Sequence, residues 1–246
     1  MAIDPAEVAA LAAAAFAGSV IFGVTGFGAA LVTVPFATHF VPLPFALAVF
    51  VLQDLSSAVR VATESPRNAV KAEVVRMVPT MIVGIVLGAT LLVSLPRKAN
   101  MLALGTFVVL YGIWSLIRRG VPSRAARGWA YLAGFCGGIF GMLFGAGGPP
   151  YAIYLSHRDL TKEQFRATLS VTSVFSIGVR ALALAVTGLL LRVDVWLTAA
   201  FVVPTALIGV ALASRAFRRV SRELLLRLVA LMLLATGVSL IARAVG

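Results

Sequence analysis

Apolar runs long enough to cross a lipid bilayer dominate this sequence. A helix needs about 20 predominantly apolar residues to span the hydrocarbon layer, and the runs that reach this length are 44–63, 77–95, 101–117, 166–190, 195–214 and 224–242. Mean hydropathy is +1.02 and only 12% of the residues are charged, which excludes an ordinary soluble protein. We therefore expect one all-helical, multi-pass membrane domain over residues 1–246.

Two further apolar stretches, 8–38 and 129–156, are too long for one crossing and too short for two. Each has a glycine cluster near its middle, in "GVTGFGAALVTVP" (23–35) and "GMLFGAGGPPYAI" (141–153). Either each stretch is one broken crossing, which gives eight spans, or each is a re-entrant hairpin that turns back at the midplane.

The basic residues distinguish these two topologies, because cytoplasmic loops carry an excess of Lys and Arg. Eight crossings would divide the 19 basic residues outside the spans nine to ten. Two hairpins and six crossings place fifteen on one side and only Arg97, Lys98, Arg192 and Arg243 on the other. We adopt the hairpin topology, with both termini outside the cytoplasm. The net charge of +12 then reflects membrane orientation and not nucleic-acid binding.

The two halves of the chain also match each other. The glycine clusters align at an offset of 119, and "PTMIVG" aligns with "PTALIG" at an offset of 125. This predicts two repeats, 1–120 and 128–246, each made of one hairpin and three crossings. Because three is odd, the second repeat has inverted topology. Inverted repeats with broken helices recur among transporters, whose substrate site lies at the midplane where the breaks meet.

The glycine clusters are candidate binding elements. Non-helical backbone at membrane depth is tolerated only where it is buried or lines a cavity, and glycine adopts turn angles closed to other residues. Short helices restart near Ala29 and Pro149, and helix N-termini favour anions. Close helix packing is the alternative role for these glycines. The residues predicted to form this part of the site are Thr25, Gly26, Phe27, Gly28, Gly145, Ala146, Gly147, Gly148 and Pro149.

Polar residues mark one face of the crossing that follows each hairpin. At an offset of 120, Arg60 corresponds to Arg180. An arginine inside the membrane costs about 2.5–3.5 kcal/mol and suggests function, and a guanidinium pair suits a carboxylate, sulfonate or sulfite. Snorkelling, or pairing with Asp54, is the alternative for either arginine. The residues predicted here are Gln53, Ser57, Arg60, Thr172, Ser173, Ser176 and Arg180, with Asp54 either carrying a coupling proton or neutralising an arginine.

With its two glycine-rich breaks, "GVTGFGAALVTVP" and "GMLFGAGGPP", the chain resembles the sulfite exporter TauE/SafE family, also called the toluenesulfonate uptake permeases. Through the repeat, the resemblance extends over nearly the whole chain. It implies export or uptake of sulfite, sulfoacetate or related sulfonates across a bacterial inner membrane. The first break, Thr25 to Gly28, follows the family pattern, whereas the second has prolines where that pattern continues into apolar residues.

We predict a transporter in the lipid bilayer that moves a small anion by alternating access, and we expect it to act as an exporter. No cofactor or metal is expected, and the sequence allows a homo-oligomer. No Ser/His/Asp set or metal-ligand cluster is present, so an enzyme is not expected. A passive aquaporin-like or anion channel is the main alternative, although the paired Asn-Pro-Ala signatures are absent. A membrane scaffold, which would carry no flux, is a third.

Overall fold

The computed structural model describes residues 5–94, 96–117 and 126–216, together with Leu231, Leu234, Gly237, Val238, Ile241, Ala242 and Val245. In the three continuous ranges the α-helices are α1 (Pro5–Thr25), α2 (Ala29–Ala37), α3 (Leu43–Glu64), α4 (Lys71–Ser94), α5 (Arg97–Ile117), α6 (Trp129–Phe144), α7 (Gly148–Ser156), α8 (Lys162–Val186) and α9 (Val193–Ala216). Short 3-10 turns precede α4 and α9, at Pro66–Asn68 and Leu189–Leu191.

The prediction of an all-helical membrane protein is confirmed. Among the described helices, α1, α3, α4, α8 and α9 are long and apolar enough to cross a bilayer. The helices α3, α4, α5, α8 and α9 coincide with five of the predicted crossings. Most of the sixth, 224–242, lies outside the described residues. The inverted relation between the two halves stays a prediction.

The two helices of the first hairpin differ in length more than expected. Helix α1 has 21 residues, which at 1.5 Å per residue is about 31 Å and enough to span the hydrocarbon layer. Its counterpart α6 has only 16. Helix α1 ends at Thr25, directly before Gly26, whose φ of 81° is not helical. The two short helices are alike, since α2 and α7 have nine residues each.

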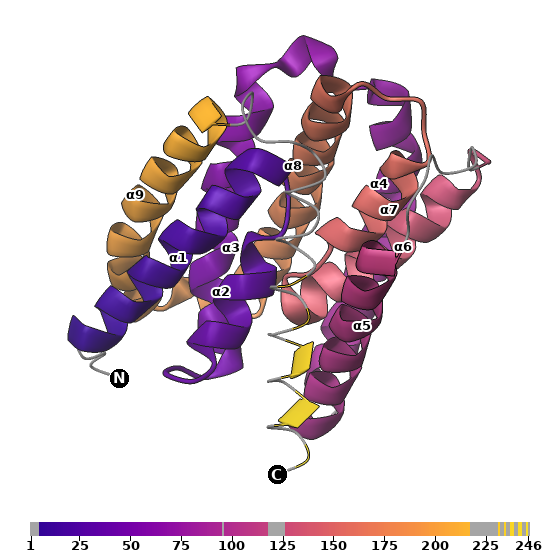
Figure 1. Cartoon of the computed structure of the whole chain (residues 1–246). Helices are drawn as coiled ribbons and strands as arrows, with labels where there is room; N and C mark the ends of the chain where they lie inside the picture. The colour runs from indigo at the N-terminus through magenta and orange to yellow at the C-terminus, as the bar shows by residue number, and fades with distance from the viewer. Residues whose placement is uncertain are drawn as a thin grey trace.

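Helices α3 and α8 form the centre of the bundle (Figure 1). On one side α3 packs against α1 and α9, which lie side by side, and on the other α8 packs against α4, which is paired with α6. Helix α3 is the most buried of the membrane-length helices. Helix α8 begins with a capping box, in which Thr161 and Gln164 each bond the other's backbone N–H. The polar faces of α3 and α8 therefore meet inside the protein.

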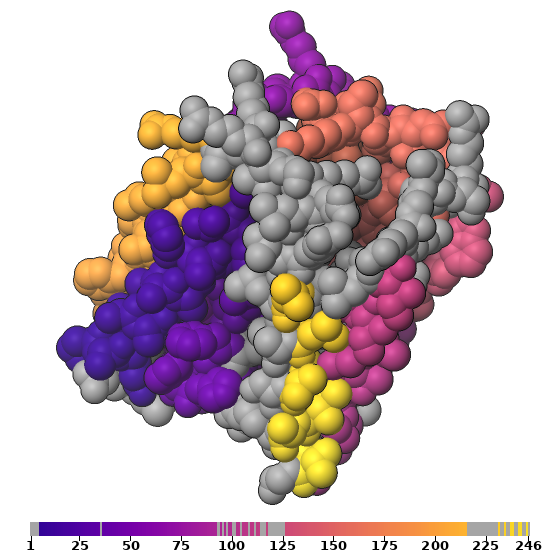
Figure 2. All heavy atoms as spheres, in the orientation of Figure 1, coloured from indigo at the N-terminus to yellow at the C-terminus, as the bar shows by residue number. Residues whose placement is uncertain are grey.

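Small residues bring the outer helices close to one another. A Cβ on Gly84 of α4 would lie 2.2 Å from the carbonyl oxygen of Phe135, and one on Gly138 of α6 would lie 2.3 Å from that of Met81. Close packing, the alternative proposed for glycine, therefore applies within these helices. Helices α1 and α9 lie on the surface together (Figure 2), and outward residues of α9 such as Leu197 and Phe201 are exposed. Such apolar faces suit a lipid environment.

Candidate functional site

The first break joins α1 to α2 through residues that cannot continue a helix. Gly26 and Gly28 have φ values of 81° and 93°, a region that side-chain-bearing residues adopt only with strain. The N–H of Gly26 donates to the carbonyl of Phe22 at 2.7 Å, and the N–H of Phe27 donates to Oγ1 of Thr25 at 3.0 Å. Helix α2 then restarts at Ala29, as the sequence predicted.

The second break, between α6 and α7, is built differently. Only Gly145 has a positive φ, of 71°. Its N–H donates to the carbonyl of Gly141 and that of Ala146 to Phe140, at 2.9 and 3.1 Å, and the first of these bonds is that of an αL-type helix end. Helix α7 restarts at Gly148 with two prolines in its first turn. Proline suits this position because its fixed φ is helical.

The two breaks touch each other. A Cβ on Gly145 would lie 2.6 Å from Cβ of Ala30, and a Cβ on Gly148 would lie 2.6 Å from Cδ2 of Phe27. Any larger residue at these positions would force the breaks apart. The start of α2 and the α6–α7 turn are therefore held in contact across the interior.

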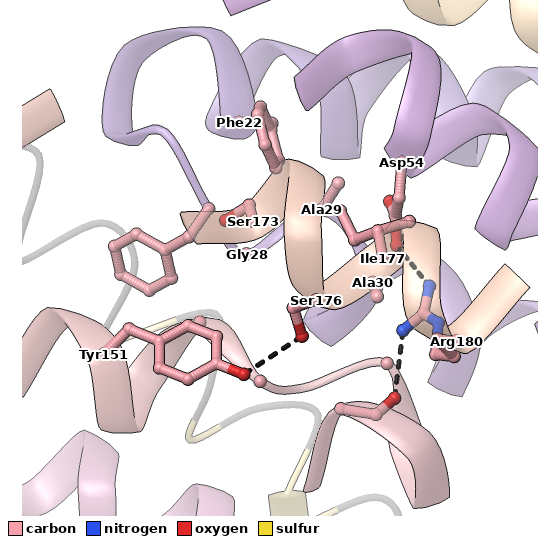
Figure 3. Close-up of a pocket in the computed structure, with 15 residues that line it drawn as sticks. Phe22, Gly28, Ala29, Ala30, Asp54, Tyr151, Ser173, Ser176, Ile177 and Arg180 are labelled. Carbon is pink, nitrogen blue, oxygen red and sulfur yellow. Dashed lines mark hydrogen bonds and ion pairs between the residues drawn. The ribbon is translucent and has the colours of Figure 1, made fainter. Parts of the chain in front are cut away.

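A pocket lies where the breaks meet (Figure 3). The empty space between its walls, counting the part that is open to the outside, is about 350 Å³. Residues of both breaks and of α3 and α8 line it. They are Phe22, Phe27, Gly28, Ala29, Ala30, Asp54, Gly141, Gly145, Gly147, Gly148, Tyr151, Ser173, Ser176, Ile177 and Arg180.

Arg180 and Asp54 form a buried ion pair in this pocket. Nη2 of Arg180 lies 3.1 Å from Oδ2 of Asp54, and both side chains are 4% exposed. Nη1 of Arg180 donates to the carbonyl of Gly141, at 3.0 Å, in the last turn of α6. The pairing that the sequence offered as an alternative for Asp54 is thus present. Arg180 both balances this carboxylate and binds the end of a broken helix.

The ion pair leaves polar atoms that have no hydrogen-bond partner among the described residues. These are Oδ1 of Asp54 and Nε of Arg180, both completely buried. Buried polar atoms are rarely left unpaired, because each costs the free energy of its lost hydration. Two residues that line the pocket therefore hold one acceptor and one donor without a partner among the described residues.

Sequence reasoning missed two residues with clear positions. Tyr151 of α7 is buried, and its hydroxyl lies 3.0 Å from Oγ of Ser176. The sequence feature that could have identified it is a tyrosine directly after the two prolines of the second break. Arg166 was assigned to a loop but lies in the first turns of α8, and it is 7% exposed.

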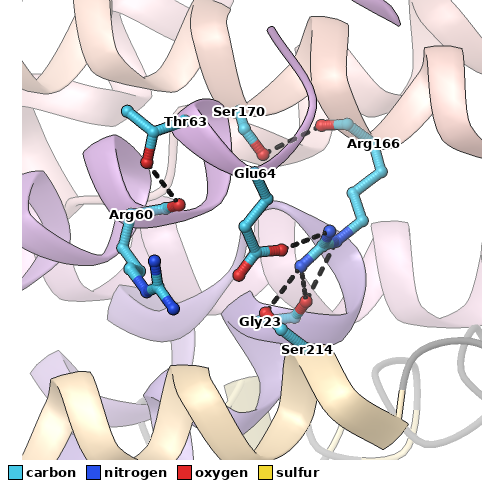
Figure 4. A network of polar contacts seen from close by, with 7 residues as sticks. All are labelled: Gly23, Arg60, Thr63, Glu64, Arg166, Ser170 and Ser214. Atoms are coloured by element: carbon cyan, nitrogen blue, oxygen red, sulfur yellow. Dashed lines mark hydrogen bonds and ion pairs between the residues drawn. The ribbon is translucent and has the colours of Figure 1, made fainter.

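Arg166 belongs to a second polar network, at the first break (Figure 4). Its Nε donates to the carbonyl of Gly23, its Nη1 to Glu64 and its Nη2 to Ser214, at 3.0, 3.0 and 2.9 Å. Like Arg180, it comes from α8, contacts a carbonyl in the last turns of a broken helix and pairs with a carboxylate of α3. It does not line the pocket.

The predicted residues divide into two groups. Those that line the pocket are Phe27, Gly28, Asp54, Gly145, Gly147, Gly148, Ser173, Ser176 and Arg180. Those that do not are Thr25, Gly26, Gln53, Ser57, Arg60, Ala146, Pro149 and Thr172.

Several members of the second group have other partners. Gln53 donates to Oγ of Ser19 at 2.9 Å, and Ser57 lies 3.4 Å from the same atom, so these residues join α3 to α1. Thr172 donates to the carbonyl of Thr168 within α8. Arg60 is exposed and lies apart from Arg180. Of the two predicted arginines, the structure therefore places only Arg180 in the pocket.

The sequence profile described as "Sulfite exporter TauE/SafE" matches residues 10–240, which includes both breaks and the polar faces of α3 and α8. The chain belongs to the sulfite exporter TauE/SafE family. It is 30% identical over 169 residues to the "Probable inner membrane transporter protein TsaS" of Comamonas testosteroni, which covers 67% of this chain and 69% of that protein. No solved structure gives a significant match. The chain is therefore a membrane transporter of the TauE/SafE type, and the family implies a small anionic substrate.

Proposed function

We propose that the chain exports small sulfur-containing anions, such as sulfite, sulfoacetate or other sulfonates, and that the anion binds in the pocket between the two breaks. The observation that carries this proposal is the contact of both breaks at one pocket that also contains Arg180. The name of the TauE/SafE family supports the sulfur chemistry. The relative from Comamonas testosteroni supports an inner-membrane location.

The start of α2 provides the main set of backbone donors. The first four N–H groups of a helix have no partner within it, no side chain caps α2, and Gly28, Ala29 and Ala30 line the pocket. The start of α7 provides fewer, because Pro149 and Pro150 have no N–H. We therefore propose that the anion binds against the start of α2, next to Arg180.

We propose alternating access as the mechanism, with the two halves moving relative to each other around the central pocket. The four polar contacts that α8 makes to α1, α3 and α6 through Arg166 and Arg180 would have to shift during this movement. We also propose that both termini lie outside the cytoplasm, which the distribution of basic residues supports. Residues of the second group, including Gln53, Ser57 and Thr172, would contribute by holding the helices that carry the site.

Flux into proteoliposomes tests the proposal. Uptake of labelled sulfite that saturates, and that speeds up when unlabelled sulfite is present inside, indicates a carrier. Conductance that does not saturate, or osmotic water flow, indicates the channel alternative. A scaffold would give neither. Repeating the uptake with a sulfonate that does not titrate, with and without a pH gradient, asks whether Asp54 carries a coupling proton. A response to the gradient in the wild type that Asp54→Asn loses indicates coupling through this residue.

A further inference from the structure

We propose that the pocket selects singly charged oxyanions that carry one hydrogen-bond donor, and that Oδ1 of Asp54 accepts this hydrogen bond. The proposal rests on the anion-binding function proposed above and adds two requirements, for the charge of the substrate and for its donor. Both requirements follow from the composition of the pocket wall.

The donor requirement comes from the geometry of Asp54. One of its oxygens, Oδ2, accepts a hydrogen bond from Nη2 of Arg180 at 3.1 Å, and this pairing favours the carboxylate form. The other, Oδ1, is buried and has no partner among the described residues. A carboxylate oxygen only accepts hydrogen bonds. A ligand that places another acceptor against Oδ1 is disfavoured, and one that places an O–H or N–H there satisfies a buried atom.

The requirement for a single charge comes from the net charge of the residues that line the pocket. Asp54 and Arg180 are the acidic and basic side chains among the lining residues, and they cancel. What remains positive is the N-terminus of α2, equivalent to about half an elementary charge. A single negative charge is largely compensated there. A dianion would bring an excess charge into a buried site, at a high desolvation cost.

A ligand with both properties can bridge the ion pair. Its oxyanion accepts from Nε of Arg180, which also lacks a partner among the described residues, and from the first amides of α2. Its donor reaches Oδ1 of Asp54. Tyr151 and Ser176, whose hydroxyls lie 3.0 Å apart in the same wall, complete a neutral polar surface. Hydrogensulfite and hydroxyalkyl sulfonates fit this description, whereas the sulfite dianion and disulfonates do not. Of the substrates proposed above, the rule therefore keeps sulfite in its hydrogensulfite form and excludes sulfoacetate, which is a dianion without a donor near neutral pH.

Three sulfonates test the proposal without interference from ligand titration, because sulfonic acids stay ionised near neutral pH. Dissociation constants of ethanesulfonate, 2-hydroxyethanesulfonate and ethane-1,2-disulfonate are measured on the purified protein by calorimetry at one pH and ionic strength. We expect 2-hydroxyethanesulfonate to bind about tenfold more tightly than ethanesulfonate, as one hydrogen bond to a charged group predicts. The disulfonate should bind most weakly.

The variant Asp54→Asn sharpens the result. Arg180 can bond only an oxygen, so the amide NH₂ of the new side chain would face the pocket and replace the acceptor with a donor. The tenfold preference for the hydroxyl should disappear, and the disulfonate should gain affinity. The matched control is Asp194→Asn, which alters a surface pair with Arg192 away from the pocket and should leave the order of the three ligands unchanged.

The outcomes are separable even if Asp54→Asn fails to fold. Equal affinity of the wild type for ethanesulfonate and 2-hydroxyethanesulfonate, or tightest binding of the disulfonate, overturns the selection rule but leaves anion transport standing. Binding of none of the three, while sulfite uptake into proteoliposomes remains saturable, overturns the rule as well. Absence of both binding and uptake overturns the proposed function itself.

Discussion

The two helix breaks differ in what they contribute to the pocket. The first has two glycines with positive φ, and it leads into a helix whose first turn keeps all its backbone N–H groups. The second has one such glycine and two prolines that lack the N–H. The arginine near the second break lines the pocket, whereas the one near the first is bound outside it. One break thus provides backbone donors and the other lies beside the guanidinium, so similar sequence motifs need not have the same role.

The largest expected difference between the two breaks is in the stability that is lost when the ion pair beside each one is broken. Removing one partner of a buried pair leaves an uncompensated charge, which costs about 3–5 kcal/mol. The Asp54–Arg180 pair is 4% exposed on both sides, and in the Glu64–Arg166 pair Glu64 is 20% exposed. Asp54→Ala should therefore lower thermal stability more than Glu64→Ala. Asp194→Ala, in a more exposed pair whose carboxylate also accepts the N–H of Val195 at the start of α9, should lower the melting temperature less than either. An equal loss for Asp54 and Glu64 would contradict this ranking.

Replacing both partners of each pair separates binding from stability. The neutral double variants Asp54→Asn/Arg180→Gln and Glu64→Gln/Arg166→Gln avoid an unpaired charge. The first should lose about a hundredfold in anion affinity, because Arg180 lines the pocket and charge-assisted hydrogen bonds are worth about 1.5–3 kcal/mol each. The second should keep the wild-type affinity. Calorimetry with sulfite measures both, and loss of binding in the second would place Arg166 in the site.

The break glycines should also respond differently to alanine. Gly145→Ala adds strain at φ 71° and brings a Cβ 2.6 Å from Ala30. Gly28→Ala adds strain at φ 93° but has no atom closer than 3.8 Å. We expect about 1–2 kcal/mol of lost stability from strain alone, hence a larger loss at Gly145. Thermal melting of the purified variants measures this, with Gly178→Ala as a control at a position with open space.

The smallest expected effect tests the missing donors of α7. Pro149→Ala restores one backbone N–H in its first turn without adding volume. If the N-terminus of α7 faces the anion, affinity for sulfite should rise by a few-fold, which calorimetry can detect. An unchanged affinity would mean that the backbone donors of the site come from α2 alone.

The sequence predicted well those features that depend on local chemistry. The glycines that end α1 and α6, the restart at Ala29 and the position of Arg180 in the wall of the pocket follow from turn preferences and from the cost of charge in a membrane. Pairing of Asp54 with Arg180 could be offered only as an alternative, because these residues are 126 positions apart and meet through the packing of α3 on α8.

Arg60 shows that alignment with Arg180 in the repeat does not place a residue in the pocket. It aligns with Arg180, but it lies six residues after Asp54. At 3.6 residues per turn this is a rotation of about 240°, so Asp54 and Arg60 point in different directions from α3. Sequence alignment matches letters and does not fix the rotation of a helix. Arg166, counted among loop charges, is buried because the carbonyl of Gly23 and the carboxylate of Glu64 satisfy its guanidinium.

The position of both buried arginines on α8 has a mechanical consequence. Arg166 binds a backbone carbonyl near the end of α1, and Arg180 binds one near the end of α6. These acceptors remain whatever side chain stands at the same position. A displacement of α8 along its axis would therefore strain the two attachments at the same moment. In the alternating-access mechanism proposed above, α8 would therefore transmit a movement at one break to the other.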